Sequence, residues 1–372
     1  MKIAIHNAQI SHYLGGTERA IYLEIKNLLK IDPDLEITLL TTKTENESIL
    51  FKKIKALQSN RFKIVLFDIS KISIEIKSDS NTSDKWHMES MQFGLRTGDY
   101  YLKNNFDLVL YHFTTDIMFL PKKFKRVLNV HGTPSKRSLL DENCLESPDV
   151  IIYTTNDIKN IIEKMHPFTK SRISKVIYLG TPVDNRIFPK KERIIDILFV
   201  GRLIKIKGVD LLIKAVHKLK NNKNLKISII GKGPEEKNLK LLVKKLGLEK
   251  NVVFHSFVSD KKLLNIYRTT KIAVFPSYKK EGIILAMLEA ASFGCGLIVS
   301  NCCGMPEFIE NNSEGLLFEP KNISDLSKKI NFLLNHPNKR EEMGKKATDK
   351  INNYWNELSK TKELYEYLRE VI

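Results

Sequence analysis

Two glutamates in the segment PSYKKEGIILAMLEAASFG stand eight positions apart, with Glu281 just before an expected helix and Glu289 inside it. At 1.5 Å per residue, eight helical residues span roughly 12 Å. This length approximates the distance between the sugar and the ribose of a nucleotide-sugar, so one carboxylate would accept hydrogen bonds at each end. The free N–H groups at the helix N-terminus would then lie under the diphosphate. By spacing alone, a first-turn acid and a solvated helix residue explain the pair better.

The segment GRLIKIKG places two cations where a diphosphate would need them. An apolar run ends at Val200, and Arg202 and Lys207 follow it at the start of the next expected helix. Guanidinium and ammonium groups bind phosphate oxygens through charge-assisted hydrogen bonds. Two basic residues in a loop are usually just solvated, so this interpretation depends on the surrounding sequence.

Short β-branched runs alternate with helical segments along the chain, which is the pattern of parallel sheets covered by helices. The expected strands cover residues 2–8, 37–40, 63–67, 107–111, 126–130, 150–153, 175–178, 195–200, 225–230, 252–255, 272–275 and 297–299. The expected helices include residues 17–29, 209–220, 235–246, 260–269 and 284–293. The polar stretch 77–85 is expected to be a loop. Two prolines and a run of charged residues in 179–193 separate the strands and helices before residue 179 from those after residue 193. This break predicts a domain boundary.

Length and composition are those of a folded two-domain protein. The 372 residues exceed what one core usually serves, and 42% apolar with 28% charged residues excludes a disordered chain. The net charge of +18 suits nucleic acid, an anionic membrane or a phosphorylated ligand, but lysines scattered through the sequence indicate compositional bias. The four cysteines lack the spacing of a zinc site or a disulfide framework.

The N-terminal residues lack the pattern of a signal peptide, and no run of 18 apolar residues occurs. We therefore expect a cytoplasmic protein. The basic cluster Lys122, Lys123, Lys125 and Arg126 follows an apolar segment, which leaves open a peripheral association with the inner face of the membrane, although a solvated loop explains it better.

The second half of the chain resembles retaining glycosyltransferase family 4, a group with the GT-B fold. The resemblance rests on segments in the family's order and spacing: FVGRLIKIKGVDLLIKA, IIGKGPEEKNL, VVFHSFVSDKKL, FPSYKKEGIILAMLEAASFGCGLIVS, GMPEFI and EGLLFEP. It implies that Arg202 and Lys207 stabilise the leaving diphosphate. It also implies that Glu281 holds the transferred sugar and that Glu289 holds the ribose.

The first half of the chain resembles the family more weakly. YLGGTERA looks like the family's glycine loop, in which the backbone N–H groups of Gly15 and Gly16 approach the donor phosphates and the acceptor. His131 in NVHGTP stands where the family has a histidine near the sugar. The run VIYLGTPVDNRIFP looks like the family's interdomain segment, with Gly180 and Asp184 matching.

The resemblance implies an α/β fold of the GT-B type, with two tandem Rossmann-like, doubly wound domains facing a central cleft. We expect an acceptor-side domain over residues 1–185 and a domain that binds the nucleotide-sugar over residues 186–352. A C-terminal helix within residues 353–372 is expected to pack back on the N-terminal domain.

The implied activity is hexosyl transfer with retention of configuration, without metal or other cofactor. The expected donor is a UDP-, GDP- or ADP-sugar and the expected acceptor is a glycan or a lipid-linked molecule, as in polysaccharide or glycolipid synthesis, with no role for nucleic acid. No side chain is an evident nucleophile, so the protein is expected to act by positioning and electrostatics while the leaving diphosphate accepts the acceptor's proton. Further donor contacts are expected from Phe257, Val258, Gly282, Ile283 and Ile284.

Two departures from the family pattern leave donor identity open. Ile283 and Ile284 replace an aromatic residue and a small residue, and branched side chains restrict the backbone. Cys303 replaces the glycine that usually precedes GMPE.

The sequence supports three other interpretations less well. GKGPEE begins like a dinucleotide-binding motif, but Glu236 occupies the place of the third glycine, which argues against an oxidoreductase. The Asp32-Pro33-Asp34 run precedes a strand and looks like a turn rather than the metal-binding DxD of another transferase fold. A non-catalytic protein of the same fold that scaffolds a partner enzyme remains the alternative function.

Overall fold

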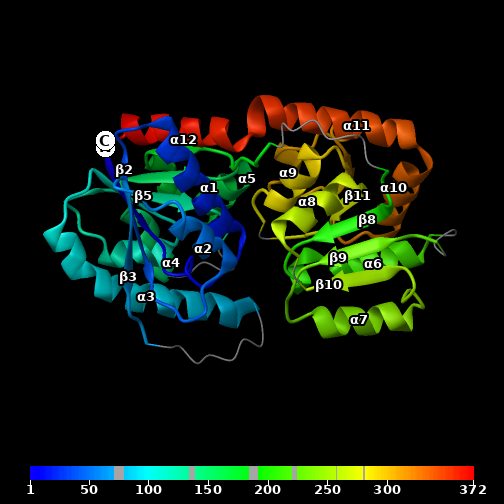
Figure 1. The fold of residues 1–372 in the computed structure, drawn as a ribbon, viewed down its shortest axis with the longest axis horizontal. Coiled ribbons are helices and arrows are strands. Elements are labelled where there is room, and N and C mark those ends of the chain that lie inside the picture. The colour runs from blue at the N-terminus through cyan, green and yellow to red at the C-terminus, as the bar shows by residue number, and fades with distance from the viewer. Residues whose placement is uncertain (71–78, 134–138, 184–191, 220–223, 257, 280) are drawn as a thin grey trace. The chain divides into compact units, whose positions relative to one another are not determined.

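The computed structural model describes the chain except for residues 71–78, 134–138, 184–191, 220–223, 257 and 280. The described residues form two compact units (Figure 1). The first unit comprises Met1–Gly180 together with Glu357–Ile372, and the second comprises Thr181–Asn356. Each unit is built around one parallel sheet with helices on both faces.

Among the described residues, seven parallel strands form the sheet of the first unit, in the order β3-β2-β1-β4-β5-β6-β7. The strands are β1 (Lys2–His6), β2 (Glu36–Thr42), β3 (Phe62–Phe67), β4 (Leu108–Tyr111), β5 (Lys125–Val130), β6 (Val150–Tyr153) and β7 (Ser174–Val176). The direction of strand addition reverses between β1 and β4. The loops that follow these two strands therefore flank a topological switch point, where doubly wound sheets bind ligands.

Successive side chains of these strands enter two separate cores, as the period of a strand requires. Ile3 and Ile5 face one core, and Ala4 faces the other. The first core is closed by α1 (Gly16–Ile31), α2 (Ile49–Lys55) and the C-terminal helix α12 (Glu357–Glu370). The second is closed by α3 (Asp79–Lys103), α4 (Leu139–Glu146), α5 (Asn156–Met165) and the 3₁₀ turn η1 (Thr114–Phe119). A second turn, η2 (Pro167–Ser171), precedes β7.

The sheet of the second unit repeats this plan with six described strands, in the order β10-β9-β8-β11-β12-β13. The strands are β8 (Ile195–Val200), β9 (Ile227–Ile230), β10 (Val252–His255), β11 (Thr270–Phe275), β12 (Gly296–Ser300) and β13 (Leu316–Phe318). The switch point lies between β8 and β11. The sequence did not predict β13, because three residues are too few for a periodicity signal.

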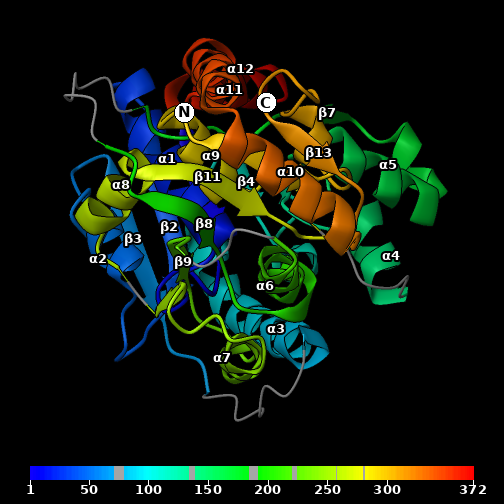
Figure 2. The same ribbon diagram turned by 90° about the vertical axis from the view of Figure 1, so that its right-hand side faces the viewer.

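Helices cover both faces of the second sheet as well. One face is covered by α6 (Val209–His217), α7 (Glu236–Lys245) and α10 (Ile323–Asn335). The opposite face carries α8 (Asp260–Arg268) and α9 (Leu285–Ser292) (Figures 1 and 2). Two 3₁₀ turns, η3 (Lys205–Lys207) and η4 (Met305–Glu307), lie in loops, and α11 (Pro337–Lys350) continues into a π-helical turn, η5 (Ile351–Trp355).

Side-chain caps explain several of the helix starts. Ser48, Thr155, Ser259 and Asn322 each stand at an N-cap and accept a hydrogen bond from the backbone N–H three residues later. Such caps satisfy a donor that has no partner within the helix. Most expected strands and helices agree with the structure to within a few residues at their ends, as for β6 and β10, whose bounds are those expected.

The expectation of a loop over residues 77–85 was wrong from Asp79 onward, where the chain is helical; residues 77 and 78 lie outside the described residues. Helix α3 buries Phe93 and Tyr101 in its later turns. Because helix propagation is cooperative, this packed part carries the polar first turns with it, and Asp, Ser and Asn are well suited to a helix start.

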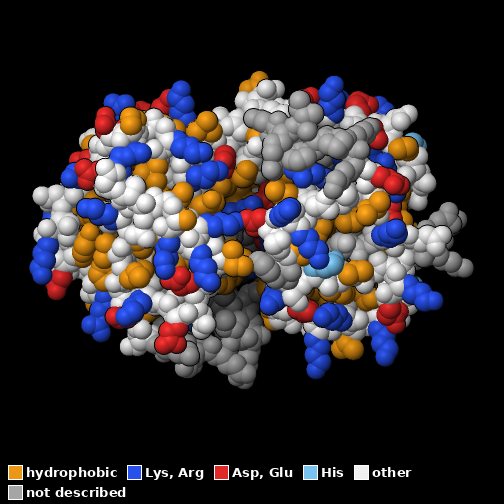
Figure 3. Space-filling view, viewed as in Figure 1, with side chains coloured by type: hydrophobic (Ala, Val, Ile, Leu, Met, Phe, Trp, Pro, Cys, Tyr) orange, Lys and Arg blue, Asp and Glu red, His pale blue; other side chains and the backbone are white. Residues whose placement is uncertain are grey.

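Basic side chains do not gather in one patch on the visible face. Lys and Arg are spread over each unit with Asp and Glu among them (Figure 3). In the expected basic cluster, Lys122 and Lys123 are exposed, whereas Arg126 is buried and pairs with Asp149 at 3.2 Å. Among the described residues, no helix combines the length and apolar character that a membrane span requires.

Candidate functional site

The loops that follow β8 and β11 meet at the switch point of the second sheet. The N–H of Tyr278 donates to the carbonyl of Ile206 at 3.1 Å. Gly208 adopts a left-handed conformation with φ of 67°, and a Cβ there would overlap the carbonyl of Pro276. Only glycine combines this backbone with this close approach. The contact joins segments that are remote in the sequence.

This loop contact brings Lys207 and Glu281 together. Lys207 Nζ donates to Glu281 Oε2 at 2.8 Å, and their side chains are 11% and 13% exposed. The Gly304 N–H donates to the carbonyl of Glu281 at 3.4 Å. Neither residue is therefore a solvated loop residue, and each neutralises the other at the carboxyl edge of the sheet.

Helix α9 begins at Leu285, four residues after Glu281. Ile284 is the N-cap and offers no side-chain hydrogen bond to the first helical N–H groups, so the helix end is suited to an anion. Gly282, Ile283 and Ile284 are all buried, and the two isoleucines are 8% and 6% exposed. The branched side chains that depart from the family pattern are thus packed into the unit.

Glu289 lies one helical turn further on and is buried, with 7% exposure. Its Oε2 accepts a hydrogen bond from the hydroxyl of Tyr267 at 2.9 Å. This excludes the interpretation of Glu289 as a solvated helix residue. Tyr267 was not anticipated, because its place beside Glu289 depends on how α8 and α9 pack.

Arg202 is partly buried in the loop that follows β8. The neighbouring Leu203 exchanges backbone hydrogen bonds with Lys232 at 2.8 Å and Glu235 at 3.0 Å. A Cβ at Gly231 or Gly233 would overlap the backbone of this loop. The glycines of GKGPEE therefore serve loop packing, which explains them without a nicotinamide site.

Two other expected positions lie beside these loops. Val258 is buried between β10 and α8, while Phe257 lies outside the described residues. Cys303 has φ of 59°, in the left-handed region that favours glycine. This explains physically why a glycine would be usual at the position. The four cysteines form no disulfide bond with one another.

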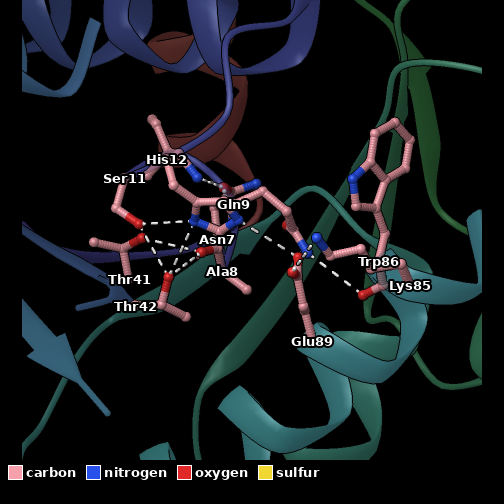
Figure 4. Close-up of polar contacts among 11 residues, drawn as sticks. Asn7, Ala8, Gln9, Ser11, His12, Thr41, Thr42, Lys85, Trp86 and Glu89 are labelled. Carbon is pink, nitrogen blue, oxygen red and sulfur yellow. Dashed lines mark hydrogen bonds and ion pairs between the residues drawn. The ribbon is translucent and has the colours of Figure 1, made fainter. Parts of the chain in front are cut away.

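In the first unit, the loop after β1 is held by polar side chains (Figure 4). Asn7 Oδ1 accepts from the N–H groups of Gln9 and Ile10 at 3.1 and 2.8 Å. Thr42 Oγ1 donates to the carbonyl of Ala8 at 2.7 Å and bonds the Ser11 hydroxyl at 2.9 Å. These bonds order the chain that leads to Gly15.

A second set of contacts ties the same loop to α3 (Figure 4). Gln9 Nε2 donates to the carbonyl of Trp86 at 3.4 Å. His12 Nε2 lies 3.6 Å from Glu89 Oε2, and Lys85 Nζ lies 3.7 Å from Glu89 Oε1. The loop is thereby fixed to β2 on one side and to α3 on the other.

The expected glycine loop forms the start of α1. Gly15 is the N-cap, and a Cβ there would lie 2.5 Å from Glu18 Oε2. Gly16 is exposed, and a Cβ there would meet no atom within 4 Å. A side chain at Gly15 would require Glu18 to move, whereas the space around Gly16 is open.

His131 directly follows β5 and bonds to a second histidine. Its Nε2 lies 2.9 Å from Nδ1 of His112, which follows β4. His112 Nε2 in turn lies 3.9 Å from Oε2 of Glu24, which α1 contributes. Burial lowers the pKa of His131 to about 4 and raises the pKa of Glu24 to about 7. The sequence predicted only His131 of these three.

Two signals in the sequence pointed to the missed residues. Glu24 stands among apolar positions on the buried face of α1, next to Ile21 and Ile25 in the helical pattern. His112 is a polar residue at the carboxyl end of a strand, as His131 is. Neither signal identifies the pairing, because α1, β4 and β5 are brought together only by the sheet.

Solved structures define the class of fold. Sucrose-phosphate synthase from Thermosynechococcus elongatus aligns with a TM-score of 0.82 and 17% identity, over 100% of this chain and 99% of that one. Anabaena HepE in complex with UDP-glucose aligns with a TM-score of 0.79 and 15% identity, over 100% of both chains. These likenesses confirm the predicted α/β fold of the GT-B type, with two Rossmann-like units.

Sequence comparison finds similarity to glycosyltransferases over part of the chain. Residues 182–350 match the family described as "Glycosyl transferases group 1". An uncharacterized glycosyltransferase from Haemophilus influenzae is 33% identical over 225 residues, which are 59% of this chain and 61% of the relative. One from Methanocaldococcus jannaschii is 33% identical over 180 residues, 47% and 46% of the two chains. The chain thus spans less than two thirds of these relatives. The predicted resemblance to glycosyltransferases is confirmed, while membership of family 4 stays a prediction.

Proposed function

We propose that this chain is a retaining, metal-independent hexosyltransferase. It would take a sugar from a nucleotide-sugar and transfer it to a glycan or lipid-linked acceptor, in the synthesis of a polysaccharide or glycolipid. The observation that carries the proposal is the buried Lys207–Glu281 pair at the switch point, beside the uncapped start of α9. This site lies in the segment that matches the glycosyltransferase family.

The two charged groups have complementary roles toward a donor. Lys207 and Arg202 would hold the diphosphate and stabilise its growing charge as it leaves. Glu281 would accept hydrogen bonds from hydroxyls of the transferred sugar. A carboxylate offers about four lone-pair sites, so Glu281 can keep its bond to Lys207 while it binds the sugar.

The far end of the donor would lie along α9. Glu289 would accept from the ribose hydroxyls, and its bond to Tyr267 would hold the carboxylate in place. Val258 would border the base. The N–H groups at the start of α9 would lie under the diphosphate, between the two ends.

The transfer itself needs no protein nucleophile in this proposal. The bond between the anomeric carbon and the diphosphate breaks, the acceptor oxygen bonds to the same face of that carbon, and the acceptor's proton passes to a diphosphate oxygen. The protein contributes by holding the reactants and by matching the developing charge. His131 and the glycine loop at Gly15 and Gly16 would take part from the first unit.

A nucleotide panel tests the donor proposal. Thermal shifts would be measured with UDP, GDP, ADP and their sugars, because a ligand that binds the folded state alone stabilises it by mass action. UDP comes first, since Anabaena HepE was solved with UDP-glucose. We expect one base to raise the melting temperature at concentrations where the others do not. No shift with any member would contradict the proposal.

Chelation tests metal independence. Transfer from the donor found in the panel would be assayed with and without excess chelator, and the rates should agree. Loss of activity in chelator, restored by manganese, would contradict this part of the proposal. Binding of the donor without any transfer to a range of acceptors would instead favour the scaffold alternative.

A further inference from the structure

Two buried polar side chains, Glu24 and His112, form a row with the half-buried His131 at the carboxyl edge of the first sheet. His131 Nε2 and His112 Nδ1 are 2.9 Å apart, and His112 Nε2 and Glu24 Oε2 are 3.9 Å apart. The two histidine rings lie 5.1 Å apart between centroids. The row therefore runs from the end of β5, past the end of β4, to α1.

The atoms along this row lack other partners. Within the described part of the chain, Glu24 Oε2, His112 Nε2 and His131 Nδ1 are buried and form no hydrogen bond. The gap of 3.9 Å between the first two is about 1 Å longer than a hydrogen bond, a difference that a small rotation of the carboxyl group closes. Buried polar atoms seldom stay unpaired, so these two have a strong reason to pair with each other.

We propose that Glu24 and His112 are positioning residues that determine which ring nitrogen of His131 carries a proton. This rests on the proposed function insofar as His131 meets the transferred sugar or the acceptor. His131 Nδ1 would then be either a hydrogen-bond acceptor or a donor, depending on one proton held at the other end of the row.

The two end states follow from the geometry. With Glu24 ionised, His112 donates from Nε2 to Glu24, and His131 donates from Nε2 to His112 Nδ1, so His131 Nδ1 is an acceptor. When a proton enters at His131 Nδ1, the Nε2 proton of His131 passes to His112 Nδ1, and the Nε2 proton of His112 passes to Glu24. His131 Nδ1 is then a donor. Both imidazoles are neutral in both states, and one proton has been taken up.

Burial favours this distribution of protons. It raises the pKa of Glu24 to about 7, and it lowers the pKa of His112 well below its usual value and that of His131 to about 4. The carboxyl group is thus the member of the row that titrates near neutral pH, while the imidazoles resist a net charge.

The other polar groups around Glu24 are neutral groups, such as an amide, and charged side chains that are already paired, so the protonation of Glu24 is coupled mainly to the two histidines. Asn129 Nδ2, from β5, donates to Glu24 Oε1 at 3.4 Å. Tyr178, Glu357 and Lys360 line the same small cavity as Glu24. Lys26 binds Glu357 at 2.7 Å, and Lys360 binds Glu363 at 3.0 Å. Lys360, which lines the cavity, and Lys26, which binds the lining residue Glu357, therefore each have a carboxylate partner.

Nitrogen-15 NMR of the imidazole rings measures the tautomers directly. In the full chain, between pH 5.5 and 8.5, we expect His112 and His131 to exchange tautomers together with a midpoint near the pKa of Glu24. In Glu24→Gln both rings should keep one tautomer throughout. Glu357→Gln, which alters the other side of the cavity, should retain the transition. Tautomers that do not change with pH, or that change equally in Glu24→Gln, would overturn the proposal.

Kinetics would link the row to transfer. His112→Gln removes the relay but retains hydrogen-bonding capacity, and it should lower kcat about 10-fold, with little change in donor KM and with loss of the pH dependence near neutrality. His112→Phe, checked for folding by circular dichroism, should behave alike. Unchanged kcat in both variants would refute the positioning role. Failure of the proposed function is distinguishable, because then no nucleotide binds the unaltered chain while the NMR result stands.

Discussion

At the scale of single residues, the Lys207–Glu281 pair shows why a buried ion pair is sensitive to the loss of one partner. Their side chains are 11% and 13% exposed, so removing one leaves the other charged, buried and unpaired. The same property makes the pair responsive to a donor, because a diphosphate and a sugar can interact with the two charges that otherwise neutralise each other.

The first prediction concerns the cations. We expect Lys207→Ala and Arg202→Ala each to lower turnover by about 10²-fold or more, since each removes a charge that stabilises the leaving group. Lys205→Ala is a matched control on the same 3₁₀ turn, because its side chain is 62% exposed and pairs with Asp210 at 3.5 Å. Steady-state rates measure the effect. If Arg202→Ala and Lys207→Ala turn over as fast as the Lys205→Ala control, Arg202 and Lys207 do not stabilise the leaving group.

The second prediction separates the two glutamates. Glu289→Gln should weaken binding of both the free nucleoside diphosphate and the intact donor, whereas Glu281→Gln should lower turnover without weakening diphosphate binding, because it leaves Lys207 free to pair with the anion. A hydrogen bond to a charged group contributes roughly 1.5 to 3 kcal/mol, and in Glu281→Gln it is lost mainly for the sugar.

Calorimetry with the diphosphate and with the donor decides between these roles. Tyr267→Phe is a useful companion variant, since it removes the hydroxyl that bonds Glu289 and should resemble a milder Glu289→Gln. If Glu281→Gln abolishes diphosphate binding while Glu289→Gln leaves it intact, the two roles are reversed.

At the scale of elements, the site depends on the close approach of the loops after β8 and β11. Gly208 has a left-handed backbone, lies under the Pro276 carbonyl, and links the turn that carries Lys207 to α6. The geometry of the charged pair is therefore set by backbone packing between two loops as well as by the side chains themselves.

The third prediction uses two glycines with the same backbone. Gly247 has φ of 66°, and a Cβ added there would meet no atom within 4 Å. Gly247→Ala therefore adds backbone strain without a steric overlap, and it should lower the free energy of unfolding by about 1 to 2 kcal/mol. Gly208→Ala adds the overlap with Pro276 to the same strain and should cost about 1 to 3 kcal/mol more. It should also weaken nucleotide binding. Denaturant unfolding of both variants measures the difference, and equal losses would show that the loops separate at little cost.

At the scale of the whole molecule, buried ionisable groups link stability to pH. Burial raises the pKa of Asp116 to about 8 and lowers that of His6 to about 3. The two side chains lie 3.9 Å apart in the core of the first unit, where Ser90 donates to Asp116 and Tyr101 bonds His6. These groups bind protons differently in the folded and unfolded states, which is the condition for pH-dependent stability.

The fourth prediction is a loss of stability between about pH 6.5 and 8. Below pH 6.5 the unfolded chain protonates histidines that stay neutral in the folded chain. The histidines therefore make stability rise with pH in this range, and this contribution opposes that of the buried carboxyl groups. Above this range, folded Asp116 and Glu24 still hold protons that their unfolded counterparts have released, so stability falls until pH passes their folded pKa values. The slope is about 1.4 kcal/mol per pH unit for each such group.

Amide hydrogen exchange in β1 and β4, corrected for its intrinsic pH dependence, measures this loss within the first unit. Asp116→Asn should reduce it, because the amide cannot ionise. Asp68→Asn alters a carboxylate whose side chain is 83% exposed and should leave the profile unchanged. A profile that is the same in all three proteins would refute the assignment to Asp116.

Local patterns in the sequence determined the alternation of strands and helices and, with it, the two doubly wound units. The periodicity of apolar residues that distinguishes a strand from a helix is a property of neighbouring residues. The sequence therefore predicted both ends of β6 and β10 correctly. The motifs also indicated Arg202, Lys207, Glu281 and Glu289, through their resemblance to a glycosyltransferase pattern rather than through spacing alone. The start of α3 was missed, since its polar first turns are helical through packing further along the chain.

The tertiary structure alone decided which of these residues touch. Lys207 and Glu281 are 74 positions apart, and His112 and His131 are 19 apart, so their pairing depends on strand order and on crossovers that no local pattern specifies. Burial of Glu289 beside Tyr267, and of Glu24 beneath the sheet, likewise follows from how helices pack on strands. The partner and pKa of a buried side chain depend on the residues packed around it, and many of these residues come from distant parts of the chain.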